Sequence, residues 1–191
     1  TVTSRGATQE ITVEANSANE MYNGSEQSVS GLKTTTFQVG DLTYTVEGLT
    51  AGAAGTDAGE YAANVIGTPV VKDAAGNDVT SEFKVNTVNG KLTIAKRQVT
   101  LTSATDSKVY DGTALANSAV TVGGDGFVGD EGATYDVTGS QTVVGSSGNT
   151  FTYELKEGTN PDNYTITPSE GTLTVTSRGA TQEITVEANS A

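Results

Sequence analysis

The chain has 191 residues, a net charge of −13 and no Cys, His or Trp. The absent residue types exclude disulfides, thiolate metal sites and the commonest general base of enzymes. The acidic balance argues against nucleic acid or anionic lipid as a partner, and no stretch is apolar enough to insert into a membrane as a helix. Abundant Gly and β-branched residues, with charged residues at only 17%, predict short strands joined by turns.

An exact repeat links the two ends of the chain. Residues 1–18 read TVTSRGATQEITVEANSA and recur unchanged as residues 174–191. Chance does not produce such a match, so we expect the parent protein to hold near-identical copies of a 173-residue unit. Identical copies in series suit a spacer or a multivalent binder better than an enzyme.

A more diverged repeat lies inside this unit. Residues 11–25 align with residues 99–113 at an offset of 88. Residues 83–95 align with residues 164–176 at an offset of 81. The unit is therefore expected to consist of two related β modules.

The predicted boundaries follow from these alignments. Module 1 covers residues 7–96 and module 2 covers residues 97–178, and each carries a net charge of −6. Residues 1–6 would end a preceding module, and residues 179–191 would begin the next repeat copy. Neighbouring identical units of the same chain are thus the first predicted partners.

Nine segments alternate apolar and polar residues, which is typical of strands with one buried face. This pattern predicts a mainly β fold of two tandem antiparallel modules, sandwich-like or β-grasp-like, arranged end to end. Alternation does not reveal strand order, so both topologies stay open. The nine segments are 11–15, 42–47, 83–86, 91–95, 99–102, 134–138, 151–156, 164–167 and 172–176.

Two connections carry a turn signal. Asn89-Gly90 suits a type I′ hairpin turn, and Glu170-Gly171 holds the matching place in module 2. A single helical turn is expected near residues 78–83.

The inward positions of the alternation give a predicted core. In module 1 these are Ile11, Val13, Tyr44, Val46, Tyr61, Phe83, Leu92 and Ile94. In module 2 they are Val99, Leu101, Tyr135, Val137, Phe151, Tyr153, Tyr164, Leu173 and Val175.

Several motifs, in this order and twice over, resemble the MBG and YDG repeat domains of bacterial surface adhesins. They are KVYDGTAL (108–115), FVGDEGATYDV (127–137) and NYTITPSEGTLTVT (163–176), with the variants MYNGS (21–25) and DVTSEFKVNTVNGKLTI (78–94) in module 1. The resemblance implies a large extracellular protein of a Gram-positive bacterium, anchored in the cell wall through a region outside these residues. It implies mainly β modules, some like a β-grasp, and it carries no catalytic residues.

The shared Tyr-(Asn/Asp)-Gly-(Ser/Thr) motif is interpreted as a buried Tyr beside a tight Asx-turn, with Gly supplying positive φ. The alternative is a ligand site. Its weak candidates are Tyr22, Tyr110 and Phe127.

Six acidic residues near Gly-rich turns raise calcium as an alternative. Their spacing lacks the alternating pattern of a calcium loop, so solvated turn carboxylates and no metal or other cofactor are expected. The six are Asp73, Asp78, Asp125, Asp130, Glu131 and Asp136.

The sequence raises two possible modifications and supports neither. An intramolecular Lys–Asn isopeptide bond needs a Lys facing an Asn in the core, whereas the lysines fall at polar positions or beside turns. Asn23 and Asn163 fit the N-glycosylation pattern, which has little meaning in a bacterial protein. The lysines are Lys33, Lys84, Lys91, Lys108 and Lys156.

The function expected from these observations is mechanical, with no enzymatic activity and no catalytic residues. The repeats would form a stalk that projects a distal adhesive domain from the cell surface. The alternative is multivalent binding of a host glycan or glycoprotein, although aromatic residues are only 6% of the chain. Self-association through edge strands is a third hypothesis, and the negative charge opposes it.

Overall fold

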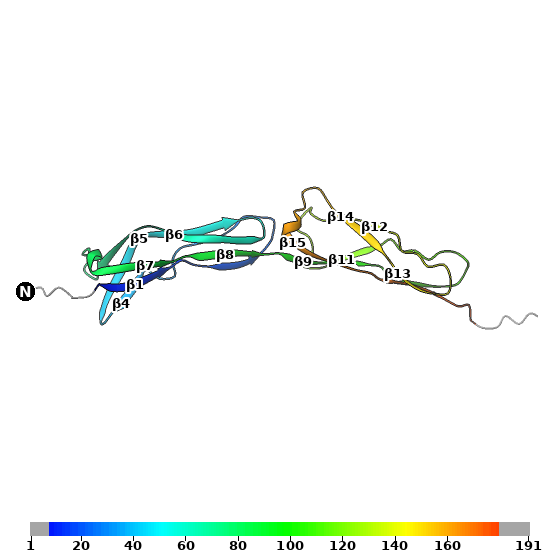
Figure 1. The fold of residues 1–191 in the computed structure, drawn as a ribbon, viewed down its shortest axis with the longest axis horizontal. Helices are drawn as coiled ribbons and strands as arrows, with labels where there is room; N and C mark the ends of the chain where they lie inside the picture. Colours follow the sequence, from blue (N-terminus) through cyan, green and yellow to red (C-terminus); the bar gives the residue numbers. More distant parts are fainter. Residues whose placement is uncertain (1–7, 180–191) are drawn as a thin grey trace, which may run out of the picture. The chain divides into compact units, whose positions relative to one another are not determined.

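The computed structural model describes residues 8–179, which are almost entirely β-structure (Figure 1). The prediction of a mainly β fold is confirmed. All nine predicted segments lie in strands or at their ends, and the expected helical turn is the 3-10 turn η1 (Thr80–Glu82).

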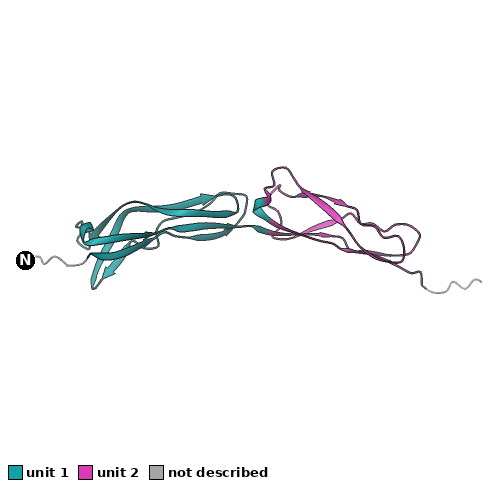
Figure 2. Cartoon of the chain, in the orientation of Figure 1, with its two compact units in different colours: residues 1–97, 162–164 teal, residues 98–161, 165–191 magenta. Residues whose placement is uncertain are grey.

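The described residues form two compact units (Figure 2). Unit 1 ends at Arg97, one residue beyond the predicted boundary, and also includes Asp162–Tyr164. Unit 2 comprises the other described residues. The predicted end of a preceding module, residues 1–6, lies outside the described residues. The predicted start of the next copy, residues 179–191, also lies outside them except for Gly179.

The modules are not purely antiparallel as predicted, because two parallel strand pairs organise unit 1. The first strand β1 pairs in parallel with β7, and β2 pairs in parallel with β8. The hairpin β5–β6 completes the main sheet in the order β2-β8-β6-β5-β3, with β4 also bonded to β5. The strands are β1 (Gln9–Glu14), β2 (Ala18–Met21), β3 (Gln27–Ser30), β4 (Thr36–Val39), β5 (Leu42–Gly55), β6 (Gly59–Asp73), β7 (Phe83–Val88) and β8 (Gly90–Ala95).

The predicted hairpin at Asn89-Gly90 is wrong. Only Asn89 separates β7 from β8, and the two strands belong to different sheets. Gly90 does not have a positive φ and pairs with Ala63 inside the ladder. A Cβ on Gly90 would lie 2.0 Å from the carbonyl oxygen of Asn16, so glycine is needed for close backbone approach.

Gly171 has the same role in unit 2, and the matching prediction of a hairpin is also wrong. Its strands β15 and β16 lie in different sheets. A Cβ on Gly171 would lie 2.4 Å from the carbonyl oxygens of Ser103 and Ala104. Both glycines therefore mark the point where a continuing strand passes from one sheet to another.

The long hairpin β5–β6 bends at two facing glycines. Its register shifts between Glu47 and Leu49, which is the signature of a β-bulge. Gly48 has φ 79° and Gly67 has φ 114°. A Cβ on Gly67 would lie 2.1 Å from the carbonyl oxygen of Gly48, so only glycine fits.

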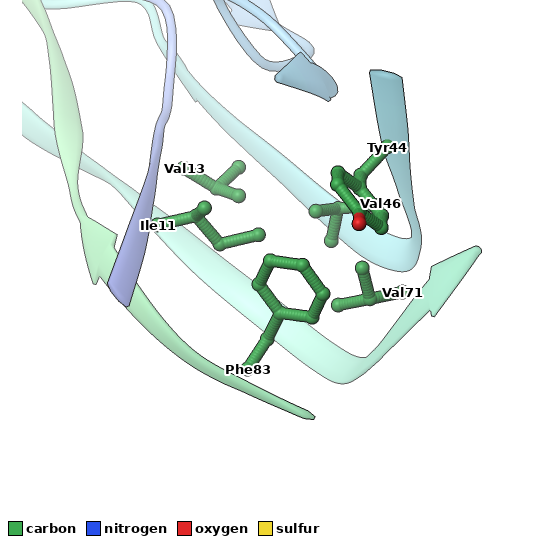
Figure 3. Close-up of a cluster of buried hydrophobic side chains, with 6 residues drawn as sticks. All are labelled: Ile11, Val13, Tyr44, Val46, Val71 and Phe83. Atoms are coloured by element: carbon green, nitrogen blue, oxygen red, sulfur yellow. The ribbon is translucent and has the colours of Figure 1, made fainter. Parts of the chain in front are cut away.

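The core of unit 1 lies between the β1–β7 pair and the β5–β6 hairpin (Figure 3). The Phe83 ring projects among the aliphatic side chains and packs against Tyr44, with ring centroids 4.7 Å apart and planes tilted by 60°. The cluster comprises Ile11, Val13, Tyr44, Val46, Val71 and Phe83. All members of the predicted core of module 1 except Tyr61 are buried.

Tyr61 is half-buried and has another role. Its ring covers Gly55, where a Cβ would lie 2.2 Å from the ring, and its hydroxyl donates to the carbonyl oxygen of Asp57 at 2.9 Å. An aromatic ring over a strand glycine fills the space that the missing side chain leaves.

Unit 2 repeats the strand plan of unit 1. Strands β9, β10, β15 and β16 occur at the sequence offsets of β1, β2, β7 and β8, and β10 pairs in parallel with β16. The strands are β9 (Arg97–Ser103), β10 (Asp106–Val109), β11 (Val120–Gly124), β12 (Ala133–Val137), β13 (Gly145–Gly148), β14 (Phe151–Leu155), β15 (Tyr164–Ser169) and β16 (Thr172–Thr176), with a 3-10 turn η2 (Pro161–Asn163).

The predicted core of module 2 is only partly correct. Val99, Leu101, Leu173 and Val175 are buried in unit 2, whereas Tyr164 is buried but belongs to unit 1. Four other residues alternate as predicted but are half-buried, because β12 and β14 form a two-stranded ribbon with no further strand paired to it in the described part of the chain. These four are Tyr135, Val137, Phe151 and Tyr153.

Replacing Gly67 by Ala should destabilise the protein by about 2 kcal/mol or more, since positive φ and a backbone clash act together. The matched control is Gly76→Ala, which has φ 85° but open space around its Cβ. That control should cost about 1 kcal/mol. Urea unfolding measures both values, and equal losses would contradict the close approach at Gly67.

Candidate functional site

The Tyr-Asn-Gly-Ser motif closes the end of β2 in unit 1. The backbone N–H of Tyr22 donates to the carbonyl oxygen of Ala95 at 2.9 Å. The Asn23 side-chain oxygen accepts from the N–H of Ser25 at 2.9 Å, and Gly24 has φ 77°. Tyr22 is 4% exposed, and its ring packs edge-on against Tyr164 of the same unit.

Unit 2 builds the same turn at the end of β10. The N–H of Tyr110 donates to the carbonyl oxygen of Thr176 at 2.8 Å. Asp111 accepts from the N–H of Thr113 at 2.9 Å, and Gly112 has φ 83°. The predicted Asx-turn is therefore confirmed in both units, whereas the predicted burial is wrong for Tyr110, which is 39% exposed.

The three ligand candidates thus lie in different settings. Tyr22 is buried at the end of β2, which leaves little of its ring for a ligand. Tyr110 is exposed at the end of β10, next to Val109, which is 56% exposed. Phe127 is half-buried in the connection between β11 and β12.

The carboxylate of Asp111 is a structural acceptor. It accepts from Lys108 Nζ at 2.8 Å as well as from both donors of Thr113. These hydrogen bonds hold the pKa of Asp111 well below its ordinary value. The bond from Lys108 is the largest cause, and the bonds from Thr113 follow.

The calcium candidates of unit 1 serve their own turns. Asp73 accepts from the N–H groups of Ala75 and Asn77 and from the side-chain amide of Asn77, which lowers its pKa, with the side-chain bond as the largest cause. Asp78 accepts from the hydroxyl and N–H of Thr80, and the hydroxyl bond is the largest cause of its lowered pKa.

The calcium candidates of unit 2 lie in or beside its connections. Asp125 accepts from the N–H of Gln98 at 2.8 Å. Asp130 and Glu131 follow in the same connection, and Asp136 points to solvent from β12. Within residues 8–179 no three acidic side chains are grouped so that they could hold a metal ion.

One lysine lies in an arrangement that contains the groups of an isopeptide site. Lys84 Nζ lies 2.8 Å from Glu10 Oε1, and the Asn86 amide donates to Glu10 Oε2 at 3.1 Å. Lys84 and Glu10 are each 59% exposed, and the Lys84 hydrogen bond is the largest cause of a lowered Glu10 pKa. Cross-link formation needs a buried, protonated acid, so this group is an exposed ion-pair network instead.

The other four lysines also lie at the surface or beside turns. Lys33 pairs with Glu14, Lys91 with Glu60 and Lys108 with Asp111. Lys156 lies beside Gly132, to which its N–H donates.

The two glycosylation-like asparagines differ in access. Asn163 is fully buried, accepts from the N–H of Ala58 at 2.7 Å and donates to Asp57 at 2.8 Å within unit 1. Its amide is therefore not available for modification in the folded chain. Asn23 is exposed, but its side-chain oxygen is engaged in the Asx-turn.

A shallow hollow of about 270 Å³ lies on the β12–β14 ribbon. It is polar, because the threonines and acids that line it alternate with the half-buried tyrosines and point to the solvent side. Sequence patterns did not single it out, because it depends on the pairing of two strands. Its lining residues are Thr134, Tyr135, Asp136, Thr152, Tyr153 and Glu154.

No protein-family model, curated protein or solved structure matches this chain. In the part of the chain that the structure describes, no helix has the length and apolar character to cross a membrane. The repeat, the topology and the surface of the units are therefore the features that bear on function.

The fall in the free energy of unfolding at acid pH should depend on Asp73 and Asp111. Because folding lowers both pKa values below the ordinary 3.8, their contribution is present above that pH and is lost as the pH falls through the folded-state pKa. We expect Asp73→Asn and Asp111→Asn to flatten the loss of stability below pH 3.8, measured by urea unfolding across pH. An unchanged fall at acid pH in the double variant would contradict this role.

Proposed function

We propose that this chain is a structural spacer unit in the stalk of a large bacterial cell-surface adhesin. The observation that carries the proposal is the parallel pairing of the first and last strands of unit 1. Since β1 and β2 run in the same direction as β7 and β8, the chain enters unit 1 at one end and leaves it at the other.

This topology makes each unit add length to a chain. The path from Phe83 to Ala95 runs through β7 and β8 with one residue between them. At a rise of about 3.3 Å per residue, unit 1 separates its entry and exit points by about 40 Å. A repeat of such units can extend a protein without new chemistry.

The surface also favours a spacer. The net charge is −6 in each of the two predicted modules, and the described ion pairs are mostly well exposed. Spread negative charge favours solubility and opposes association between neighbouring stalks. Neither the identical copies nor the absence of His supports an enzymatic function.

The resemblance to MBG and YDG repeat domains supports a location. We propose an extracellular protein attached to the cell wall through a region outside these residues, with a distal adhesive domain that the repeats hold away from the cell. Neighbouring repeat units are then the main partners of each unit, and no cofactor is required.

Small-angle X-ray scattering on proteins with one, two and three copies of the 173-residue unit tests the spacer role. We expect the maximum dimension to grow by a near-constant increment per copy, with and without a calcium chelator. Compaction or association as copies are added would overturn the proposal. A chelator-sensitive increment would show that a metal ion stiffens the chain.

Direct glycan binding is the second candidate, and the exposed ring of Tyr110 favours it. Sugars pack their apolar faces on exposed aromatic rings, and repetition supplies avidity. If this candidate is correct, the chain should bind to a host-glycan array, and the Tyr110→Ala variant should not bind. The control Val122→Ala removes a side chain of similar exposure, 40%, in the same unit and should bind normally.

A further inference from the structure

We propose that unit 1 is a tension-resisting element, held against pulling forces by its terminal strand pairs, β1–β7 and β2–β8. This goes beyond the spacer role, because a spacer needs only length whereas a tension-resisting element must stay folded when its ends are pulled apart. The proposal rests on the direction in which the paired strands run.

The terminal strand pairs are extensive. β1 and β7 align over six register partners, from Gln9 with Phe83 to Glu14 with Val88. β2 and β8 align over four more. The hydrogen bond from Ala15 N–H to Val88 O, at 2.9 Å, continues the pairing between the two segments.

Tension along the chain loads these pairs in shear. Force enters unit 1 at the start of β1 and leaves at the end of β8, and both strands point in the same direction. Pulling the ends apart therefore slides β1 and β2 along β7 and β8, so that the hydrogen bonds share the load at once. If the same strands were pulled from a shared end, the bonds would break one after another, and the force needed at any moment would be that of a single bond.

Side chains on these strands also oppose sliding. Val13, Leu92 and Ile94 on these strands are almost fully buried, so any slip exposes apolar surface. The Lys84–Glu10 ion pair bridges β1 and β7 directly. Gly90 lets β8 approach the Asn16 backbone closely, because a Cβ there would lie 2.0 Å from the Asn16 carbonyl oxygen.

Unit 2 has the counterpart of the β2–β8 pair. β10 and β16 pair in parallel over four register partners, and Tyr110 N–H donates to Thr176 O at the end of the pair. Ser103 is buried and joins the neighbouring segments, since it donates to Asn149 O and accepts from Gly171 N. We therefore expect the resistance to recur along the repeat.

Single-molecule pulling on the full chain tests the proposal, because the chain has no Cys and two introduced ones define the direction of force. Thr8→Cys with Lys96→Cys loads the terminal strand pairs in shear. Thr8→Cys with Glu82→Cys, the matched control, pulls β1 and β7 apart from their shared start. All three positions are exposed, so we expect both variants to fold, which circular dichroism checks before pulling.

The expected result is a several-fold higher unfolding force for the 8/96 pair than for the 8/82 pair at the same pulling speed. Equal forces, or a lower force for the 8/96 pair, would overturn the proposal. That failure would leave the spacer role intact if scattering still shows constant growth per copy. The two proposals therefore fail in different experiments.

Discussion

The parallel pairing of the first two strands of unit 1 with its last two is the constraint on which the structure depends. It sends the chain in at one end and out at the other, and it places β1 and β7 over the β5–β6 hairpin so that Phe83 and Tyr44 meet in the core. Parallel strands need a long crossover between them, and the long β5–β6 hairpin with its flanking strands supplies that connection.

Glycine makes this plan feasible. A strand that passes from one sheet to another brings its backbone against a second backbone, as Gly90 does at Asn16 and Gly171 at Ser103 and Ala104. The facing pair Gly48 and Gly67 forms a bulge in the long hairpin. One half of the hairpin packs on β1 and β7, and the other half pairs with β8. The high glycine content thus reflects close backbone crossings as much as turns.

Local patterns predicted what depends on local physics. Period-two alternation located nine of the strands but missed β6, which buries Ala63 and Val71. The Asx-turns after Tyr22 and Tyr110 followed from residue type. Pairing partners are non-local, so the same patterns mistook Asn89-Gly90 for a hairpin turn and gave no sign of the parallel pairs. Short or Gly/Ala-rich strands such as β3, β13 and the far half of β5 do not alternate apolar and polar residue types, although burial alternates along β3 and the far half of β5.

The separation of the entry and exit points of unit 1 is the most direct measure of this topology. Spin labels on Cys residues introduced at Thr8 and Lys96, both exposed, report that distance by pulsed electron resonance. Parallel terminal pairs predict a narrow distribution near 40 Å, from about 3.3 Å per residue along β7 and β8. A distance below about 20 Å, as a β7–β8 hairpin would give, would contradict the parallel pairing and with it the spacer and tension-resisting roles.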